Sequence, residues 1–208
     1  NCDTATASVT VDAPVLAAVA DTPTAQNGFT GGTTPESVLD NDTLNGAAVD
    51  PADVTLTPGT APSPAAGSIS MNADGTITVA AGTTAGTYNY GYTICEVLNP
   101  TNCDTVTASV TVDAPAIAAV DDTPTSQNGF AGGTTPESVL DNDTLNGVAV
   151  VPANVTLTPG TAPSPTAGSI TMNADGTITV AAGTTAGTYN YGYTSCEGLN
   201  PANCSTAT

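Results

Sequence analysis

The amino-acid sequence repeats itself at a period of about 101 residues. Gly86–Cys95 recurs as Gly187–Cys196, and residues 1–11 copy residues 102–112. Self-similarity at a fixed period is typical of tandem arrays, and a period near 100 residues matches one small all-β domain. We therefore predict three parts: residues 1–13 as the last strand of a preceding repeat, 14–114 as a complete repeat, and 115–208 as a repeat that lacks its last strand.

Alternating residues predict a two-stranded hairpin at the centre of each repeat. Tyr88, Tyr90 and Tyr92 occupy every second position, so an extended chain directs all three to one face. Apolar residues alternate with Thr and Ser in the same way along Cys103–Val112. Both arms therefore read as strands with one buried and one solvated face.

The five cysteines fit this hairpin. Cys95 and Cys103 stand where the two arms meet their loop, and Cys196 and Cys204 occupy the same places in the next repeat, so we predict two disulfides. Cys2 matches Cys103, and its partner is expected upstream of residue 1. Disulfides of this kind indicate an oxidising, extracellular setting.

Short strands and turns are expected along the rest of the repeat. The candidate strands are residues 15–19, 37–39, 54–57, 68–71 and 76–79. Asn45-Gly46 predicts a type I′ turn, Asp74-Gly75 predicts the turn of a second hairpin, and Pro58–Gly67 is a Pro-rich loop that cannot join a ladder. With no helical period, the predicted fold class is all-β, built from tandem immunoglobulin- or cadherin-like β-sandwiches.

The charge of the chain excludes several functions. It contains no Lys, Arg or His and has a formal net charge of −19. A polyanion cannot neutralise phosphates, so we expect no nucleic-acid partner, and this segment contains no run that would insert into a membrane. A threonine nucleophile needs a neighbouring base, and the chain has no His or Lys to act as one. We predict that the chain is not an enzyme and needs no cofactor for catalysis.

Acidic clusters make calcium the one candidate ligand. Carboxylate and amide oxygens are what Ca²⁺ prefers, and it takes six to eight of them. The candidate ligands are Asp40, Asp42, Asp121, Asp122, Asp141 and Asp143. The alternative is that these residues cap turns and bond the local backbone. Ala20 stands where Asp121 stands one period later, which removes a carboxylate from the first joint.

The order of several short phrases resembles a known group of proteins. These are Asp-Thr-Pro23, Val-Leu-Asp-Asn-Asp-Thr43, Asn-Ala-Asp-Gly-Thr-Ile-Thr-Val79, the tyrosine strand, and Thr-Ala-Ser-Val-Thr-Val112. Together with the Cys-x7-Cys hairpin they are similar to Ig-like and cadherin-like repeats of giant cell-surface adhesins of gliding Bacteroidota. The resemblance implies type IX secretion, a surface filament, and a role in gliding or attachment.

The same resemblance draws attention to a modification pattern. Asp followed by Thr and an apolar residue resembles the O-glycan acceptor pattern of Bacteroidota. The pattern occurs at Thr4, Thr43, Thr105 and Thr144. We expect Thr43 and Thr144 to lie in an exposed acidic turn, where an attached glycan would not disturb the packing of the core.

These observations favour a mechanical function. We expect a stalk or spacer in an extracellular surface filament or adhesin, with neighbouring repeats of the same chain as partners and with lateral self-association into filaments. Two alternatives remain. One is a carbohydrate-binding module, which would need exposed aromatic residues. The other is a subunit of a multi-chain fibre, in which the leading strand Asn1–Val11 completes the open sandwich of a neighbouring chain. The receptor is not specified by the sequence.

Overall fold

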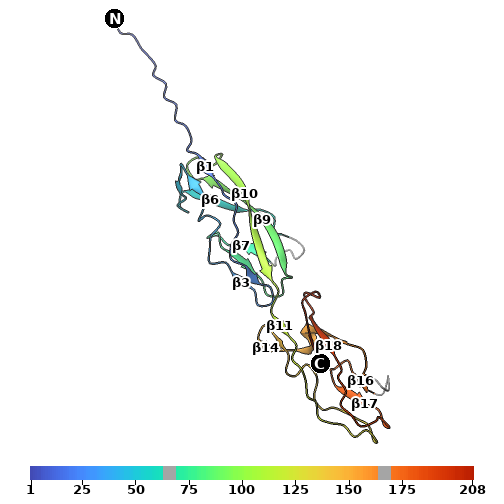
Figure 1. The fold of residues 1–208 in the computed structure, drawn as a ribbon. Helices are drawn as coiled ribbons and strands as arrows, with labels where there is room; N and C mark the ends of the chain where they lie inside the picture. Colours follow the sequence, from blue (N-terminus) through green and yellow to red (C-terminus); the bar gives the residue numbers. More distant parts are fainter. Residues whose placement is uncertain (63–68, 164–169) are drawn as a thin grey trace. The chain divides into compact units, whose positions relative to one another are not determined.

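The computed structural model describes residues 1–62, 69–163 and 170–208, and its regular structure is almost entirely β (Figure 1). The chain divides into two compact units. Unit 1 contains Asn1–Gln26 and Thr30–Asp113, and unit 2 contains Asn27–Phe29 and Ala114–Thr208. In the described ranges no helix is long and apolar enough to cross a bilayer. The predicted all-β class is confirmed.

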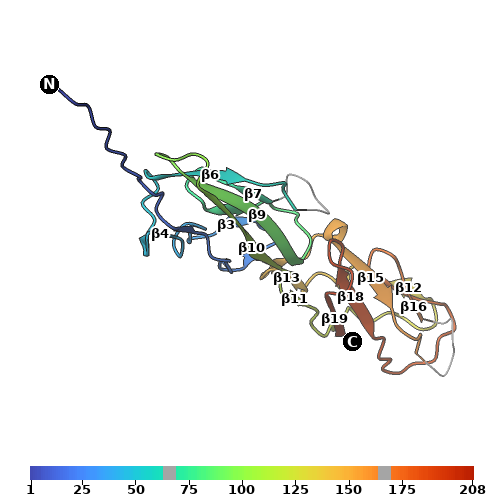
Figure 2. The same cartoon turned by 90° about the horizontal axis from the view of Figure 1, so that it is seen from above.

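The described residues of unit 1 form three sheets, and Figure 2 labels several of their strands. All of the pairings are antiparallel where a register is defined. The largest has the order β2-β10-β9-β6, with β2 Gln26–Asn27, β6 Val54–Pro58, β9 Gly86–Glu96 and β10 Cys103–Asp113. The second has the order β3-β8-β7, with β3 Gly32–Thr33, β7 Ile69–Met71 and β8 Ile77–Val79. The third has the order β1-β4-β5, with β1 Leu16–Ala17, β4 Thr43–Leu44 and β5 Ala47–Ala48.

The tyrosine hairpin is the longest element of unit 1. Strands β9 and β10 are 11 residues each and pair from Cys95 with Cys103 to Gly86 with Val112. The three tyrosines of β9 are buried, and β10 buries Ala108, Val110 and Val112. The residues at every second position are therefore the ones that face the core in both strands, as the sequence predicts.

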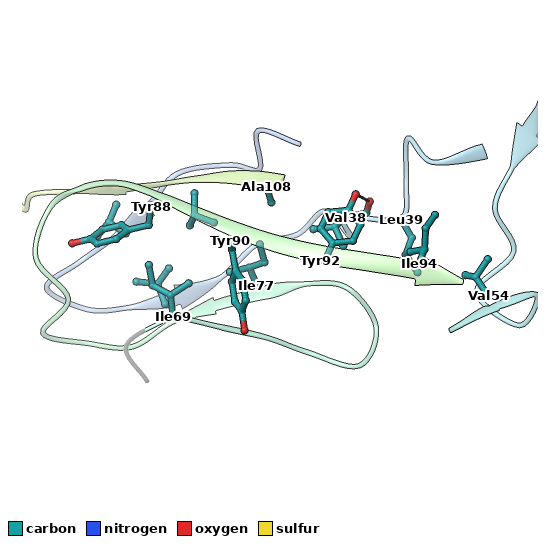
Figure 3. Close-up of a cluster of buried hydrophobic side chains, with 13 residues drawn as sticks. Val38, Leu39, Val54, Ile69, Ile77, Tyr88, Tyr90, Tyr92, Ile94 and Ala108 are labelled. Atoms are coloured by element: carbon teal, nitrogen blue, oxygen red, sulfur yellow. Dashed lines mark hydrogen bonds between the residues drawn. The ribbon is translucent and has the colours of Figure 1, made fainter. Parts of the chain in front are cut away.

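Two of these sheets enclose one hydrophobic core. The tyrosines of β9 belong to the same cluster as Ile69 of β7 and Ile77 of β8 (Figure 3). Ile77 and Ile94 are fully buried. Burial of apolar surface between two facing sheets defines a β-sandwich, so the side chains of β9 form the contact surface of the two layers.

Tight turns connect the short strands where the sequence predicts them. Asn45 and Gly46 have φ values of 54° and 79°, the two positive angles that a type I′ turn needs, and they join β4 to β5. Gly75 has φ of 82° and closes the β7–β8 hairpin by donating its N–H to the carbonyl of Asn72.

The expectation of a strand at residues 37–39 is wrong. Val38 and Leu39 are buried, but the segment is a turn. The Ser37 hydroxyl accepts the N–H of Leu39, and the Asp40 carboxylate accepts the N–H of Ser37. These local bonds replace a ladder. The predicted Pro-rich loop begins one residue too early, because Pro58 is the last residue of β6 and lies opposite Tyr92 in the ladder. Residues 63–67 of that loop lie outside the described ranges, as does Ser68 of the predicted strand that follows.

Unit 2 repeats this layout with a shorter hairpin. Its sheets have the orders β11-β13-β14, β12-β17-β16 and β15-β18-β19. The strands are β11 Ile117–Ala118, β12 Gly133–Thr134, β13 Thr144–Leu145, β14 Val148–Ala149, β15 Val155–Pro159, β16 Ile170–Met172, β17 Ile178–Val180, β18 Tyr193–Glu197 and β19 Cys204–Ala207. A 3-10 turn, Pro152–Asn154, precedes β15. We expected this repeat to lack its last strand, and the structure contains four residues of that strand, as β19.

The leading segment belongs to none of these sheets. Residues 1–13 carry no strand in the described chain and are drawn as a plain trace (Figure 1). Val9 is 86% exposed and Val11 is 88% exposed. Their counterparts one period later, Val110 and Val112, are 0% and 2% exposed because they pack inside unit 1.

Both hairpins are closed by a disulfide. Cys95 bonds to Cys103, and Cys196 bonds to Cys204, each with Cα atoms 4.1 Å apart. Cys2 is exposed and has no disulfide partner among the described residues. Each bridge joins two directly opposed residues, so it holds the loop end of the hairpin in register.

Serine at both Cys95 and Cys103 should lower the free energy of unfolding of unit 1 by about 2.5 kcal/mol, because a closed loop of about nine residues is released in the unfolded chain. Urea unfolding followed by tyrosine fluorescence measures this. The matched control is Cys2→Ser, which should leave the unfolding midpoint unchanged. A double variant with the wild-type midpoint would contradict the role of the bridge.

Candidate functional site

An acidic cluster surrounds the buried hydroxyl of Tyr92. Strand β9 brings this hydroxyl to 2.9 Å from the carbonyl oxygen of Val38 and 2.9 Å from Oδ2 of Asp21. Both carboxylate oxygens of Asp42 lie 3.4 Å from it. Segments that are far apart in sequence therefore meet at one phenol, and none of the sequence motifs pointed to Tyr92 or Asp21 as polar partners.

The structure separates the two aspartates of the Asp40-Asn41-Asp42 turn. Asp42 is fully buried, and its Oδ1 accepts the N–H of Val19 at 2.7 Å. Asp40 is exposed and caps the N–H of Ser37 at 3.0 Å. The expectation of a wholly exposed acidic turn is wrong, because Asp42 satisfies a backbone donor inside the unit.

One proton must serve two acceptors at Tyr92. A phenol has a single O–H, so it cannot donate to Val38 and Asp21 at once. Burial raises the pKa of Asp21 from 3.8 to about 6, and the nearby carboxylate of Asp42 adds to that rise. The hydrogen bond that the Tyr92 hydroxyl donates to Asp21 lowers the pKa of that carboxyl and so offsets part of the effect of burial.

Unit 2 contains a similar arrangement. In unit 1 the tyrosine hydroxyl lies nearer to Asp21 than to Asp42, whereas in unit 2 it bonds to Asp143, the counterpart of Asp42. The Tyr193 hydroxyl lies 2.8 Å from the carbonyl of Val139 and 3.0 Å from Oδ1 of Asp143. Burial raises the pKa of Asp122 to about 6 and also raises that of Asp143. Within the described residues, Oδ2 of Asp122 and of Asp143 have no hydrogen-bond partner. The cluster is therefore a property of the repeat.

A second buried carboxylate lies inside the disulfide loop. Glu96 is 5% exposed, and it accepts side-chain amide hydrogens from Asn99 at 2.8 Å and from Asn102 at 2.9 Å. Asn102 also donates to the carbonyl of Pro14. Glu197, Asn200 and Asn203 repeat this contact. Sequence reasoning missed it, although the signal was present as a Glu followed by two Asn between paired cysteines.

The candidate calcium ligands do not converge. In the described chain no group of three or more acidic or cysteine side chains is arranged to hold a metal ion. Asp121 accepts the N–H of Thr208, and Asp141 caps Ser138 as Asp40 caps Ser37. Asp21, Glu36 and Asp40 line an open recess of about 240 Å³, and a recess of about 210 Å³ repeats it at Asp122, Glu137 and Asp141.

The candidate glycosylation sites differ in exposure. Thr4 and Thr105 are exposed, whereas Thr43 in β4 and Thr144 in β13 are half-buried. The Thr105 hydroxyl lies 2.9 Å from that of Thr93 across the β9–β10 pair. O-glycosylation stays a prediction, with Thr4 the position least involved in structure.

No protein-family model and no curated protein sequence matches the chain. Solved structures similar to it have low sequence identity. A SusE-like surface located polysaccharide binding protein from Bacteroides thetaiotaomicron is 11% identical over 93% of this chain and 33% of that one, with a TM-score of 0.35. The human desmocollin-1 ectodomain is 12% identical over 94% and 35%, with a TM-score of 0.38. Mouse protocadherin-24 EC1-3 is 17% identical over 93% and 69%, with a TM-score of 0.34. The chain thus spans about a third of the first and second of these.

Acidification from pH 7 to pH 5 should raise the melting temperature by a few degrees. The pKa of Asp21 and of Asp122 is higher in the folded state, so their contribution to stability is complete below pH 3.8 and is lost as the pH rises through about 6. Hydrogen bonds lower the pKa of Glu36 and Glu137, whose contribution is lost only below pH 4.5, outside this window.

Thermal melts across this pH range measure the effect. The double variant Asp21→Asn, Asp122→Asn should flatten the profile. Asp3→Asn with Asp12→Asn is the charge-matched control, because both residues are exposed in the leading segment, and it should keep the wild-type slope. A wild-type melting temperature that falls on acidification to pH 5 would count against the assignment.

Millimolar calcium or EDTA should leave the melting temperature unchanged, because five of the six candidate ligands, all except Asp122, accept hydrogen bonds from separate backbone N–H groups. Differential scanning calorimetry in both solutions checks this. A rise of several degrees with calcium that Asp42→Asn abolishes would instead establish a calcium site.

Proposed function

We propose that this chain is a structural stalk or spacer repeat of an extracellular surface filament or adhesin. The observation that supports this most directly is the repetition of one disulfide-closed sandwich in two tandem units. Each unit also repeats the buried tyrosine, the carboxylate cluster and the amide-bonded glutamate. A unit that is repeated together with the same internal disulfide and hydrogen bonds adds length and rigidity to an array.

The chemistry of the chain is suited to a position outside the cell. Structural disulfides persist in oxidising compartments. The chain has no Lys or Arg, so trypsin-like proteases have no cleavage site in it. A net charge of −19 opposes non-specific association with other acidic surfaces. The resemblance to gliding adhesins makes type IX secretion and a role in gliding or attachment the setting that we propose.

The carbohydrate-binding alternative receives less support. Such a module would need exposed aromatic rings, whereas Tyr88, Tyr90 and Tyr92 are at most 7% exposed in unit 1. Each of these rings packs in the hydrophobic cluster instead. A receptor-binding part is therefore better sought elsewhere than on the tyrosine strand.

Deleting one period, residues 14–114, from the protein in the cells that produce it should preserve attachment and shorten the reach of the filament by about 30–40 Å, the length of one strand of roughly eleven residues. Electron microscopy with an antibody to the repeat measures the reach, and an adhesion assay measures attachment. Loss of attachment with normal surface labelling would show that the repeat itself binds the substratum.

A further inference from the structure

The sequence contains four Asn-Gly pairs, and two of them form the turns of short hairpins. Asn45-Gly46 joins β4 to β5, and Asn146-Gly147 joins β13 to β14. The other two pairs are Asn27-Gly28 and Asn128-Gly129. Asn-Gly bonds are chemically reactive, because glycine has no side chain to hinder attack by its backbone nitrogen on the neighbouring amide carbon.

Asn45-Gly46 is the pair that the structure leaves most accessible. Both residues are exposed, and a Cβ atom added to Gly46 would meet no atom within 4 Å. Among the described residues, neither the side-chain amide of Asn45 nor the N–H of Gly46 has a hydrogen-bond partner. The amide carbon and the nitrogen that would attack it are therefore both in contact with water.

The strands that hold this turn are short. β4 and β5 pair only through Thr43 with Ala48 and Leu44 with Ala47, and both residues of β5 are exposed. A short, exposed ladder opens locally at a lower free energy than the whole unit unfolds. Opening lets the peptide between Asn45 and its glycine rotate until the glycine nitrogen reaches the amide carbon, Cγ.

The Asn128-Gly129 pair is held in place. Oδ1 of Asn128 accepts the N–H of Phe130 at 2.9 Å, and the carbonyl of Gly129 accepts the N–H of Gly183 at 2.8 Å. A Cβ atom at Gly129 would collide with the carbonyl oxygen of Thr184, so the peptide has little room to rotate. The same two residues are thus fixed here and loosely held at the β4–β5 turn.

The remaining two pairs are also less accessible than Asn45-Gly46. Asn27 is half-buried, its Oδ1 accepts the N–H of Phe29 at 2.9 Å, and Gly28 is buried. Asn146 has the same turn geometry as Asn45, with φ of 55°, but it is half-buried. The four pairs are chemically alike, so the structure around each of them decides its reactivity.

We propose that Asn45 is a site of spontaneous deamidation in the folded chain. The Gly46 nitrogen gives its proton to hydroxide and attacks Cγ of Asn45, and the amide group leaves as ammonia with a proton from water. A five-membered succinimide results. Water then opens this ring at Cγ, which gives aspartate, or at the backbone carbonyl carbon, which gives isoaspartate. The net reaction consumes one water and releases one ammonia. It rests on the fold and not on the proposed spacer function.

Both products change the hairpin. Each adds a carboxylate to a chain that already has a net charge of −19. Isoaspartate also adds a methylene group to the backbone, so a two-residue turn no longer matches the pairing of Leu44 with Ala47. Leu44 pairs in addition with Leu16 of β1, which packs against the core. We therefore expect isoaspartate at this position to loosen the β1-β4-β5 sheet.

Peptide mapping of the folded 208-residue chain after incubation at mildly alkaline pH tests the proposal. A protease that cleaves before aspartate releases residues 42–49, which contain Asn45, and residues 122–140, which contain Asn128. Isoaspartate resists this protease and leaves 42–49 intact, with the mass gain of NH2 replaced by OH, whereas aspartate creates a new cut before residue 45. Products should form at Asn45 at least about tenfold faster than at Asn128, because the β4–β5 ladder opens more readily.

The chain unfolded in urea is the control for structure, since the two sites should then react at similar rates. Equal rates at the two sites in the folded chain would overturn the proposal. So would an Asn45 that stays intact in the folded chain over a period in which the unfolded chain reacts completely.

The effect on the hairpin has its own control variant. Asn45→Gly keeps the positive φ that the turn needs and removes the amide. Its melting temperature should survive the incubation unchanged, whereas that of the parent should fall by a few degrees as isoaspartate accumulates. A parent that has reacted fully at Asn45 and still melts like Asn45→Gly would show that the turn tolerates the longer backbone, contrary to the loosening expected here.

Discussion

The antiparallel pairing of β9 with β10 supports the rest of unit 1. It sets the alternation that places three tyrosines and three small apolar residues on one side. It also brings Cys95 opposite Cys103 and carries the Tyr92 hydroxyl to the carbonyl of Val38.

A chain without a single basic side chain must satisfy its carboxylates by other means. Hydrogen bonds from backbone N–H groups, hydroxyls and amides take the place of ion pairs. Asp42 accepts from Val19, Asp104 accepts from Ala18, and Glu96 accepts from two asparagines. At Asp21, burial outweighs the hydrogen bonds that the carboxyl group accepts, and its pKa rises to about 6.

The two proposals concern different levels of the same architecture. A spacer needs units that hold their own shape, and the disulfide, the tyrosine core and the carboxylate cluster act within one unit. Deamidation concerns a single hairpin turn within unit 1, the one that joins β4 to β5.

The sequence by itself determined the repeat, the all-β class, the hairpin and its register, because period-2 alternation and paired cysteines are local signals that survive without tertiary information. It also predicted the Asn45-Gly46 turn from the positive φ values that this pair tolerates. Only the tertiary structure decided that residues 37–39 form a turn, that Asp42 is buried while Asp40 is not, and that Asp21 meets Tyr92. These outcomes depend on which distant donors arrive beside a side chain. Asp40 and Asp42 are equivalent in the sequence pattern, and they differ in the structure because only Asp42 lies inside the unit, beside the backbone N–H of Val19.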